Sequence, residues 1–135
     1  MAEVSWLICC EEFIVKENGL CDAKDLLFEL HTPQVPVVGK VGIDVAALWR
    51  TDDPEGEAPL TIRMAMVFKG GVVQPSNETW TLTFTSPQVL WYKRITDLYL
   101  QEYGFTSIAI QALENGEWET KAEYPIMVMS SRETA

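Results

Sequence analysis

The chain has 135 residues, of which 47% are hydrophobic and 22% are charged; this composition is ordinary for one globular domain and unlike that of a disordered chain. Ten Lys and Arg stand against 20 Asp and Glu, which gives a formal net charge of −10. A surface of that sign repels phosphate groups and anionic lipid headgroups, so nucleic acid and membrane surfaces are excluded as expected partners.

The first residues, MAEVSWLICCEEF, lack the features of a secretory signal. Glu3 stands where a basic residue is expected, and Glu11 interrupts the apolar run from Trp6 to Cys10. No apolar run in the sequence approaches the roughly 20 residues that a membrane-spanning helix needs. We therefore predict a cytoplasmic protein.

A β-hairpin is predicted around Asn18-Gly19, because this dipeptide between two strand patterns favours a type I′ turn. A two-residue turn pairs Glu17 with Leu20 and Cys10 with Leu27. In that register Cys10 and Cys21 lie on the outer face as exposed thiols. The face predicted to be buried carries Leu7, Cys9, Phe13, Val15, Leu26, Phe28 and Leu30.

The same register argues against a disulfide or a metal site at the cysteines. Cys21 lies roughly 20 Å along the hairpin from Cys10, whereas a disulfide needs Cα atoms within about 7 Å. Cys9 and Cys10 point to opposite faces, so they cannot bind one ion together. Acidic neighbours disfavour a reactive thiolate, and His31 is more typical of the end of a strand than of a general base. We predict no catalytic residue, metal ligand or cofactor.

Period-two alternation continues along the chain in VGIDVAALWR, LTIRMAMVFK and TWTLTFTS. The residues predicted to point inward are Val41, Ile43, Val45, Ala47, Trp49, Leu60, Ile62, Met64, Met66, Phe68, Trp80, Leu82 and Phe84. The segment VLWYKRITDLYLQEYGF is compatible with a strand or a short helix. The pattern predicts an all-β, two-sheet antiparallel β-sandwich of immunoglobulin-like type with about eight strands, as one domain over 1–135 with a frayed tail at 130–135.

The loop TDDPEGEAP, residues 51–59, concentrates four carboxylates at Asp52, Asp53, Glu55 and Glu57. Calcium sites in sandwich loops use such ligands. The spacing here matches no calcium motif, and Pro54 with Gly56 is typical of a solvated turn. A solvated loop is therefore the favoured interpretation.

Aromatic residues are the candidate binding groups. The chain has five tryptophans, and flat aromatic side chains stack on sugars or anchor protein interfaces. Packing in the core or at an edge is the favoured interpretation for these side chains, and it is assigned outright to Trp49 and Trp80, which fall on apolar faces. The residues proposed as a binding surface are Trp6, Trp91, Tyr92 and Trp118.

Two stretches, CEEFIVKENGLCDAKDLLFELHTPQVPVVG and DLYLQEYGFTSIAIQALENGEW, carry a resemblance to a bacterial family of small β-sandwich domains of unknown function. The matching elements are Cys10-Glu11-Glu12, Asn18-Gly19, Pro33, Pro36, Leu98-Tyr99-Leu100, Gly104-Phe105 and Asn115-Gly116. The chain departs from the family pattern at Cys21-Asp22, where apolar residues are usual. The resemblance implies a small β-sandwich and no catalytic residues.

The sequence thus favours a non-catalytic binding or structural module that acts on a protein partner or by self-association. Unpaired edge strands can augment a partner sheet. A small-ligand or carbohydrate-binding module is the first alternative. A thiol enzyme or hydrolase centred on His31 and Cys10 or Cys21 is the second alternative and the least favoured.

Overall fold

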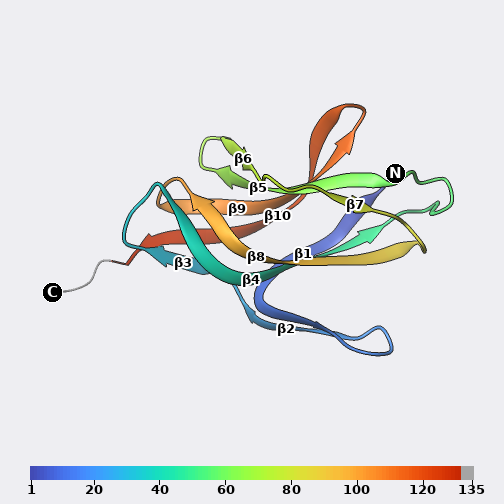
Figure 1. Cartoon of the computed structure of the whole chain (residues 1–135), viewed down its shortest axis with the longest axis horizontal. Helices are drawn as coiled ribbons and strands as arrows, with labels where there is room; N and C mark the ends of the chain where they lie inside the picture. Colours follow the sequence, from blue (N-terminus) through green and yellow to red (C-terminus); the bar gives the residue numbers. More distant parts are fainter. Residues whose placement is uncertain (132–135) are drawn as a thin grey trace.

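The alternating pattern folds into two packed β-sheets, seen in the computed structural model, which describes residues 1–131 (Figure 1). The first sheet has the order β2 (Cys21–Leu26), β1 (Glu3–Val15), β4 (Val37–Arg50) and β8 (Gln88–Leu100). The second has the order β3 (Glu29–Thr32), β10 (Glu117–Ser130), β9 (Gly104–Glu114), β5 (Leu60–Phe68) and β6 (Val73–Pro75), with β7 (Trp80–Leu82) also paired to β5.

The predicted all-β, two-sheet sandwich is confirmed, and its strand pairs are antiparallel except for β3 with β10. The structure has ten strands instead of about eight. The difference arises from β3, β6 and β7, which are only three or four residues long and too short to show a clear alternation. The described residues form no helix that could cross a membrane.

The core lies between the two sheets and contains the side chains that alternation assigned to it. Those fully or nearly buried are Ile43, Val45, Ala47, Trp49, Leu60, Ile62, Met64, Met66, Phe68, Leu82 and Phe84. Val41 and Trp80 are partly buried and pack against this cluster. From β9, Ile108 and Ile110 complete the core, so the period-two prediction for these segments is confirmed.

The segment that was compatible with a strand or a helix is a strand, β8. It pairs with β4 from Val37 opposite Leu100 to Arg50 opposite Gln88. Cross-strand pairs such as Ala47 with Trp91 and Ile43 with Ile95 bury apolar side chains against the core. Packing on β4 therefore decided between the two conformations.

The predicted frayed tail begins later than expected. Ser130 is the last residue of β10, and the Ser131 N–H donates to the Thr32 carbonyl at 3.0 Å. These bonds to the edge strand β3 hold the chain in place as far as Ser131. The remainder of the predicted tail, 132–135, lies outside the described residues.

The hairpin forms at Asn18-Gly19, but its register differs by one residue from the prediction. Asn18 and Gly19 have φ values of 61° and 74°, as a type I′ turn requires. The Lys16 N–H, not that of Glu17, donates to the Leu20 carbonyl. Pairing therefore brings Cys10 opposite Leu26, so the predicted partner Leu27 is wrong.

The predicted faces of this hairpin are also wrong beyond Cys10. The Leu27 N–H donates to Cys9 O, whereas farther along the Lys16 N–H donates to Leu20 O, so the hydrogen-bonding phase of β1 shifts by one residue between them. Asp25, in the middle of the shift, has a left-handed φ of 56°. As a result Phe13 lies beside Cys10 in a second buried cluster.

Residues 11–26, which we call the hairpin arm, leave β4 after Cys10 and lie below the four-stranded sheet in Figure 1. Cys10, predicted to be an exposed thiol, is fully buried because the arm packs over it. Val15, Leu26 and Phe28, predicted to be in the core, are exposed. Only Leu7, Cys9 and Leu30 of that predicted face reach the main core, together with its neighbour Leu27.

Thiol accessibility checks this arrangement. All three cysteines are free, and only Cys21 is exposed. We expect a colorimetric thiol reagent to label one thiol per folded chain and three in denaturant. A Cys21→Ser variant should show no rapid labelling when folded. Two rapidly reacting thiols in the wild type would instead mean that the arm does not cover Cys10.

Candidate functional site

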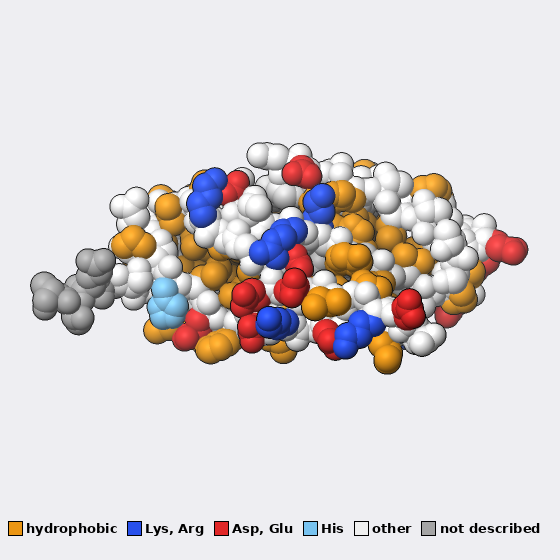
Figure 2. Space-filling model, turned by 60° about the horizontal axis from the view of Figure 1, so that its bottom comes forward, with side chains coloured by type: hydrophobic (Ala, Val, Ile, Leu, Met, Phe, Trp, Pro, Cys, Tyr) orange, Lys and Arg blue, Asp and Glu red, His pale blue; other side chains and the backbone are white. Residues whose placement is uncertain are grey.

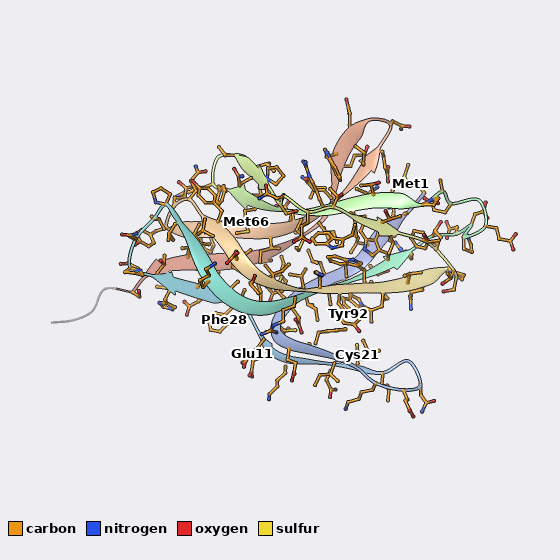
Figure 3. The ribbon with its side chains drawn as sticks, in the orientation of Figure 1. Met1, Glu11, Cys21, Phe28, Met66 and Tyr92 are labelled. Carbon is orange, nitrogen blue, oxygen red and sulfur yellow. The ribbon has the colours of Figure 1, made fainter. Side chains whose placement is uncertain are left out.

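Trp6 and Tyr92 lie on the outer face of the four-stranded sheet, where the hairpin arm packs. The Phe13 ring centroid lies 6.3 Å from that of Trp6 and 5.6 Å from that of Tyr92. Cys10 and Ala46 are buried in the same cluster. Figure 3 shows Tyr92 on the side of the sheet that faces the arm. Trp6 and Tyr92 therefore pack against Phe13 and hold the arm on the sheet. About half of the Tyr92 surface (49%) remains exposed to solvent.

A nearly buried carboxylate, that of Asp44, fixes the bend where the arm leaves the sheet. Its Oδ2 accepts a hydrogen bond from the Phe13 N–H at 2.8 Å, and its Oδ1 lies 3.2 Å from Arg94 Nη1. The same Arg94 nitrogen donates to the Glu11 carbonyl at 2.9 Å. A Cβ at Gly42 would lie 2.8 Å from Arg94 Nη2, so glycine leaves space for the guanidinium. The network joins β1, β4 and β8.

Trp91 does not share this surface, although Tyr92 follows it directly. It packs against the main core, and its ring centroid lies 5.3 Å from that of Trp80. Successive residues of a strand point to opposite faces, so Trp91 points between the sheets while Tyr92 points outward.

Trp118 lies on a third surface, the outer face of the six-stranded sheet. The Arg63 guanidinium carbon lies 4.1 Å from the centre of its ring, a cation–π contact. Arg63 Nε also donates to Gln111 Oε1 at 2.8 Å. The four residues proposed as a binding surface are therefore distributed over three separate places.

The cysteines and His31 are not arranged as a nucleophile with its base. Burial raises the pKa of the Cys9 thiol, and burial followed by the nearby Asp44 carboxylate raises that of Cys10. Both thiols are therefore protonated at neutral pH. Cys21 is exposed on the arm (Figure 3), and His31 is half exposed on β3 with Nε2 3.7 Å from Glu29 Oε1.

The acidic loop uses some of its carboxylates for its own structure. Asp53 Oδ1 accepts a hydrogen bond from the Gly56 N–H at 3.0 Å, and Glu57 Oε2 accepts one from Thr51 Oγ1 at 3.1 Å. Across residues 1–131, no three side chains of His, Cys, Asp or Glu are grouped as ligands for a metal ion.

A cleft of about 480 Å³ opens along one side of the sandwich, between β8 and residues 74–80, which run from β6 to the start of β7. Its walls include the apolar side chains of Met64, Met66, Trp80, Tyr99 and Ile108. Sequence alternation assigned the first three to the core, and Met64 and Met66 are indeed nearly buried. The sandwich is thus less tightly closed on this side.

The rim of the cleft is charged. Glu78, Lys93 and Asp97 line it, and Asp97 Oδ1 lies 2.7 Å from Lys40 Nζ. Lys93 forms no ion pair with any of the described residues, in contrast to its neighbour Arg94. Figure 2 shows the neighbouring face of the molecule, where acidic and basic side chains are interspersed with exposed hydrophobic ones.

β8 borders this cleft and is an edge strand, since within residues 1–131 it pairs only with β4. The Thr51 N–H donates to the Pro87 carbonyl at 2.9 Å, just beyond the pair Arg50 with Gln88. Hydrogen-bonded residues alternate along an antiparallel strand, so the odd-numbered residues of β8 up to Ile95, where the register with β4 shifts, bond to β4. The even-numbered residues from Gln88 to Arg94 direct their N–H and C=O groups to the open edge.

The sequence predicted neither the cleft nor the free edge of β8. One signal was available: β8 contains Lys93, Arg94 and Asp97 between aromatic and β-branched residues. Charges in the middle of a strand are typical of an edge, where they discourage unwanted pairing. Which strand lies at an edge depends on sheet order, however, and alternation carries no information about that order.

Comparison with known proteins leaves the family open. No family model matches the chain, and no curated protein matches it. Among solved structures, it is similar to the alkylpurine DNA glycosylase AlkC of Pseudomonas fluorescens, bound to DNA containing an abasic site analog, with a TM-score of 0.45 and 10% identity. That match covers 91% of this chain but only 30% of the glycosylase chain. The resemblance to a bacterial β-sandwich family stays a prediction.

Removing the Asp44 carboxylate tests the network that holds the arm. We expect Asp44→Ala to lower the free energy of unfolding by about 1–3 kcal/mol, because the Phe13 N–H loses its acceptor and Arg94 its partner. Denaturant titration measures this change. The control is Glu3→Ala, which breaks the exposed pair of Glu3 and Arg50 and should cost less than about 1 kcal/mol. Equal effects of the two variants would contradict a special role for Asp44.

Proposed function

We propose that this protein is a non-catalytic binding module that takes up an extended segment of a polypeptide along the free edge of β8. The observation that carries the proposal is the position of that edge. Its unpaired N–H and C=O groups lie beside a cleft with apolar walls. Addition of a strand to an exposed sheet edge is an established mode of peptide recognition.

The cleft favours a particular kind of segment. Main-chain hydrogen bonds to β8 supply affinity, and alternate side chains of the segment point into the cleft and supply specificity. Met64 and Met66 are flexible and polarizable, so they adapt to apolar side chains of different shape. Lys93 on the rim is available to pair with a carboxylate of the bound segment.

The charge of the chain supports a protein partner over nucleic acid or a membrane surface, since a net charge of −10 repels both. The three free cysteines support a cytoplasmic location, because unpaired thiols are typical of reducing compartments.

The alternative of a carbohydrate-binding module ranks second. Sugar stacking needs an aromatic ring with an open face. Trp91 packs against Trp80, and one face of Trp118 is occupied by Arg63, which leaves Tyr92 as the most exposed of the four candidates. A thiol enzyme ranks third, because burial raises the pKa of the Cys9 and Cys10 thiols.

Panning a phage-displayed library of random peptides tests the proposal. We expect enrichment of peptides with alternating apolar residues. Leu90→Pro should abolish their binding, because proline removes an N–H group that faces the open edge. Leu90→Ala is the matched control, since it removes the same side chain and keeps that N–H group. Lack of enrichment, or equal binding to both variants, would count against strand addition at β8.

A further inference from the structure

We propose that the segment taken up by β8 is acidic at one defined position: it places a carboxylate opposite Lys93 and, two residues later, a large apolar side chain opposite Trp91. This inference rests on the proposed function, since it concerns the same edge and the same cleft. It goes further by naming the chemistry of the partner, the direction of its chain and its register.

The side chains of β8 up to Ile95 are divided between two faces, and burial supports the division. Val89, Trp91 and Ile95 pack against the core between the sheets. Lys93 stands in the same alternation and lines the cleft. Leu90 packs instead with the second cluster on the outer face. Between residues 88 and 95, the side of β8 that faces the cleft therefore carries one charged side chain, that of Lys93.

Lys93 has no acidic partner among the described residues, whereas two basic side chains near it do. Arg94 pairs with Asp44 at 3.2 Å, and Lys40 pairs with Asp97 at 2.7 Å. An ammonium group loses water when a bound strand covers it. It therefore stabilises a segment that supplies a carboxylate, and it disfavours a segment that supplies an apolar or basic side chain.

Main-chain geometry fixes where the carboxylate lies. Because the N–H and C=O groups of Lys93 are directed at β4, a strand added at the free edge meets Lys93 in a non-hydrogen-bonded pair. The Cβ atoms of such a pair lie about 4.5–5.5 Å apart, and opposite charges there stabilise it. Antiparallel pairing is the more stable arrangement. In that direction the residue two positions after the acid lies opposite Trp91.

The other positions of the segment favour apolar side chains. The residue between these two positions points outward beside Tyr92, which packs against Phe13 and keeps about half of its surface exposed. Pairs of an aromatic with a β-branched residue across strands are stabilising. A second acid on the cleft side would find no other unpaired cation on β8 and would enter a cleft that Glu78 also lines. The segment therefore carries one acid and not an acidic run.

Fluorescence anisotropy with labelled synthetic peptides tests the proposal. The probe is Ser-Glu-Val-Phe-Thr-Val-Ser, in which Glu is designed to meet Lys93 and Phe to meet Trp91. The comparison peptide has Lys in place of Glu. We expect the wild type to bind the Glu peptide about fivefold or more tightly than the Lys peptide. The net charge of −10 attracts cations, so general electrostatics alone would give the opposite preference.

Charge reversal at one site provides the control. Lys93→Glu should make the protein prefer the Lys peptide. Lys69→Glu causes the same change of net charge between β5 and β6, outside the residues that line the cleft, and should leave the preference for the Glu peptide. Both lysines are exposed, and circular dichroism with thermal melting checks that each variant is folded.

A peptide of reversed sequence, Ser-Val-Thr-Phe-Val-Glu-Ser, tests the direction of the chain. With its Glu opposite Lys93 in an antiparallel pair, its Phe lies beyond Lys93 and not opposite Trp91. We therefore expect weaker binding than that of the probe.

The outcomes separate this inference from the proposed function. Equal binding of the Glu and Lys peptides, a Lys93→Glu variant that keeps the wild-type preference, or equally tight binding of the reversed peptide would each overturn the register proposed here. If peptides from the library still bind and lose binding with Leu90→Pro, strand addition at β8 stands with a different segment. If neither the library nor the synthetic peptides bind, both are wrong.

Discussion

The carboxylate of Asp44 is the contact on which the unusual part of this fold depends. It is nearly buried in β4, accepts the Phe13 N–H from β1 and pairs with Arg94 of β8. A buried carboxylate is costly unless it is hydrogen-bonded and paired, and here both conditions are met at the point where β1 bends. The bend places Phe13 over Cys10, so a second apolar cluster forms on the outer face of the four-stranded sheet.

The two edges of the four-stranded sheet differ. The arm extends β2 and the end of β1 away from β4, while β8 is left with one unpaired edge within the described residues. The guanidinium of Arg94 is turned toward Asp44 and Glu11 on the outer face. Lys93 and Asp97 line the cleft.

Alternation predicted the core well, because a half-buried strand must place apolar residues at every second position to pack on one side. Trp49, Ile62 and Met66 were assigned to the interior from this pattern alone, and they are buried. The prediction failed in the hairpin, where one shift of hydrogen-bonding phase near Asp25 moves Phe13 to the face that carries Cys10, and the arm then buries Cys10. Local turn signals located the turn at Asn18-Gly19 but not the shift, which depends on a carboxylate 31 residues away in sequence from Phe13.

The sequence by itself determined the class of fold, most of the inward-facing residues and the acidic character of the surface, since these follow from side-chain period and composition. Only the tertiary structure decided which aromatic residues share a surface, that Cys10 is buried, and that β8 lies at an edge beside a cleft. The physical reason is that strand order and the path of the hairpin arm are set by contacts between segments far apart in the chain, such as Asp44 with Arg94. No local pattern records those contacts.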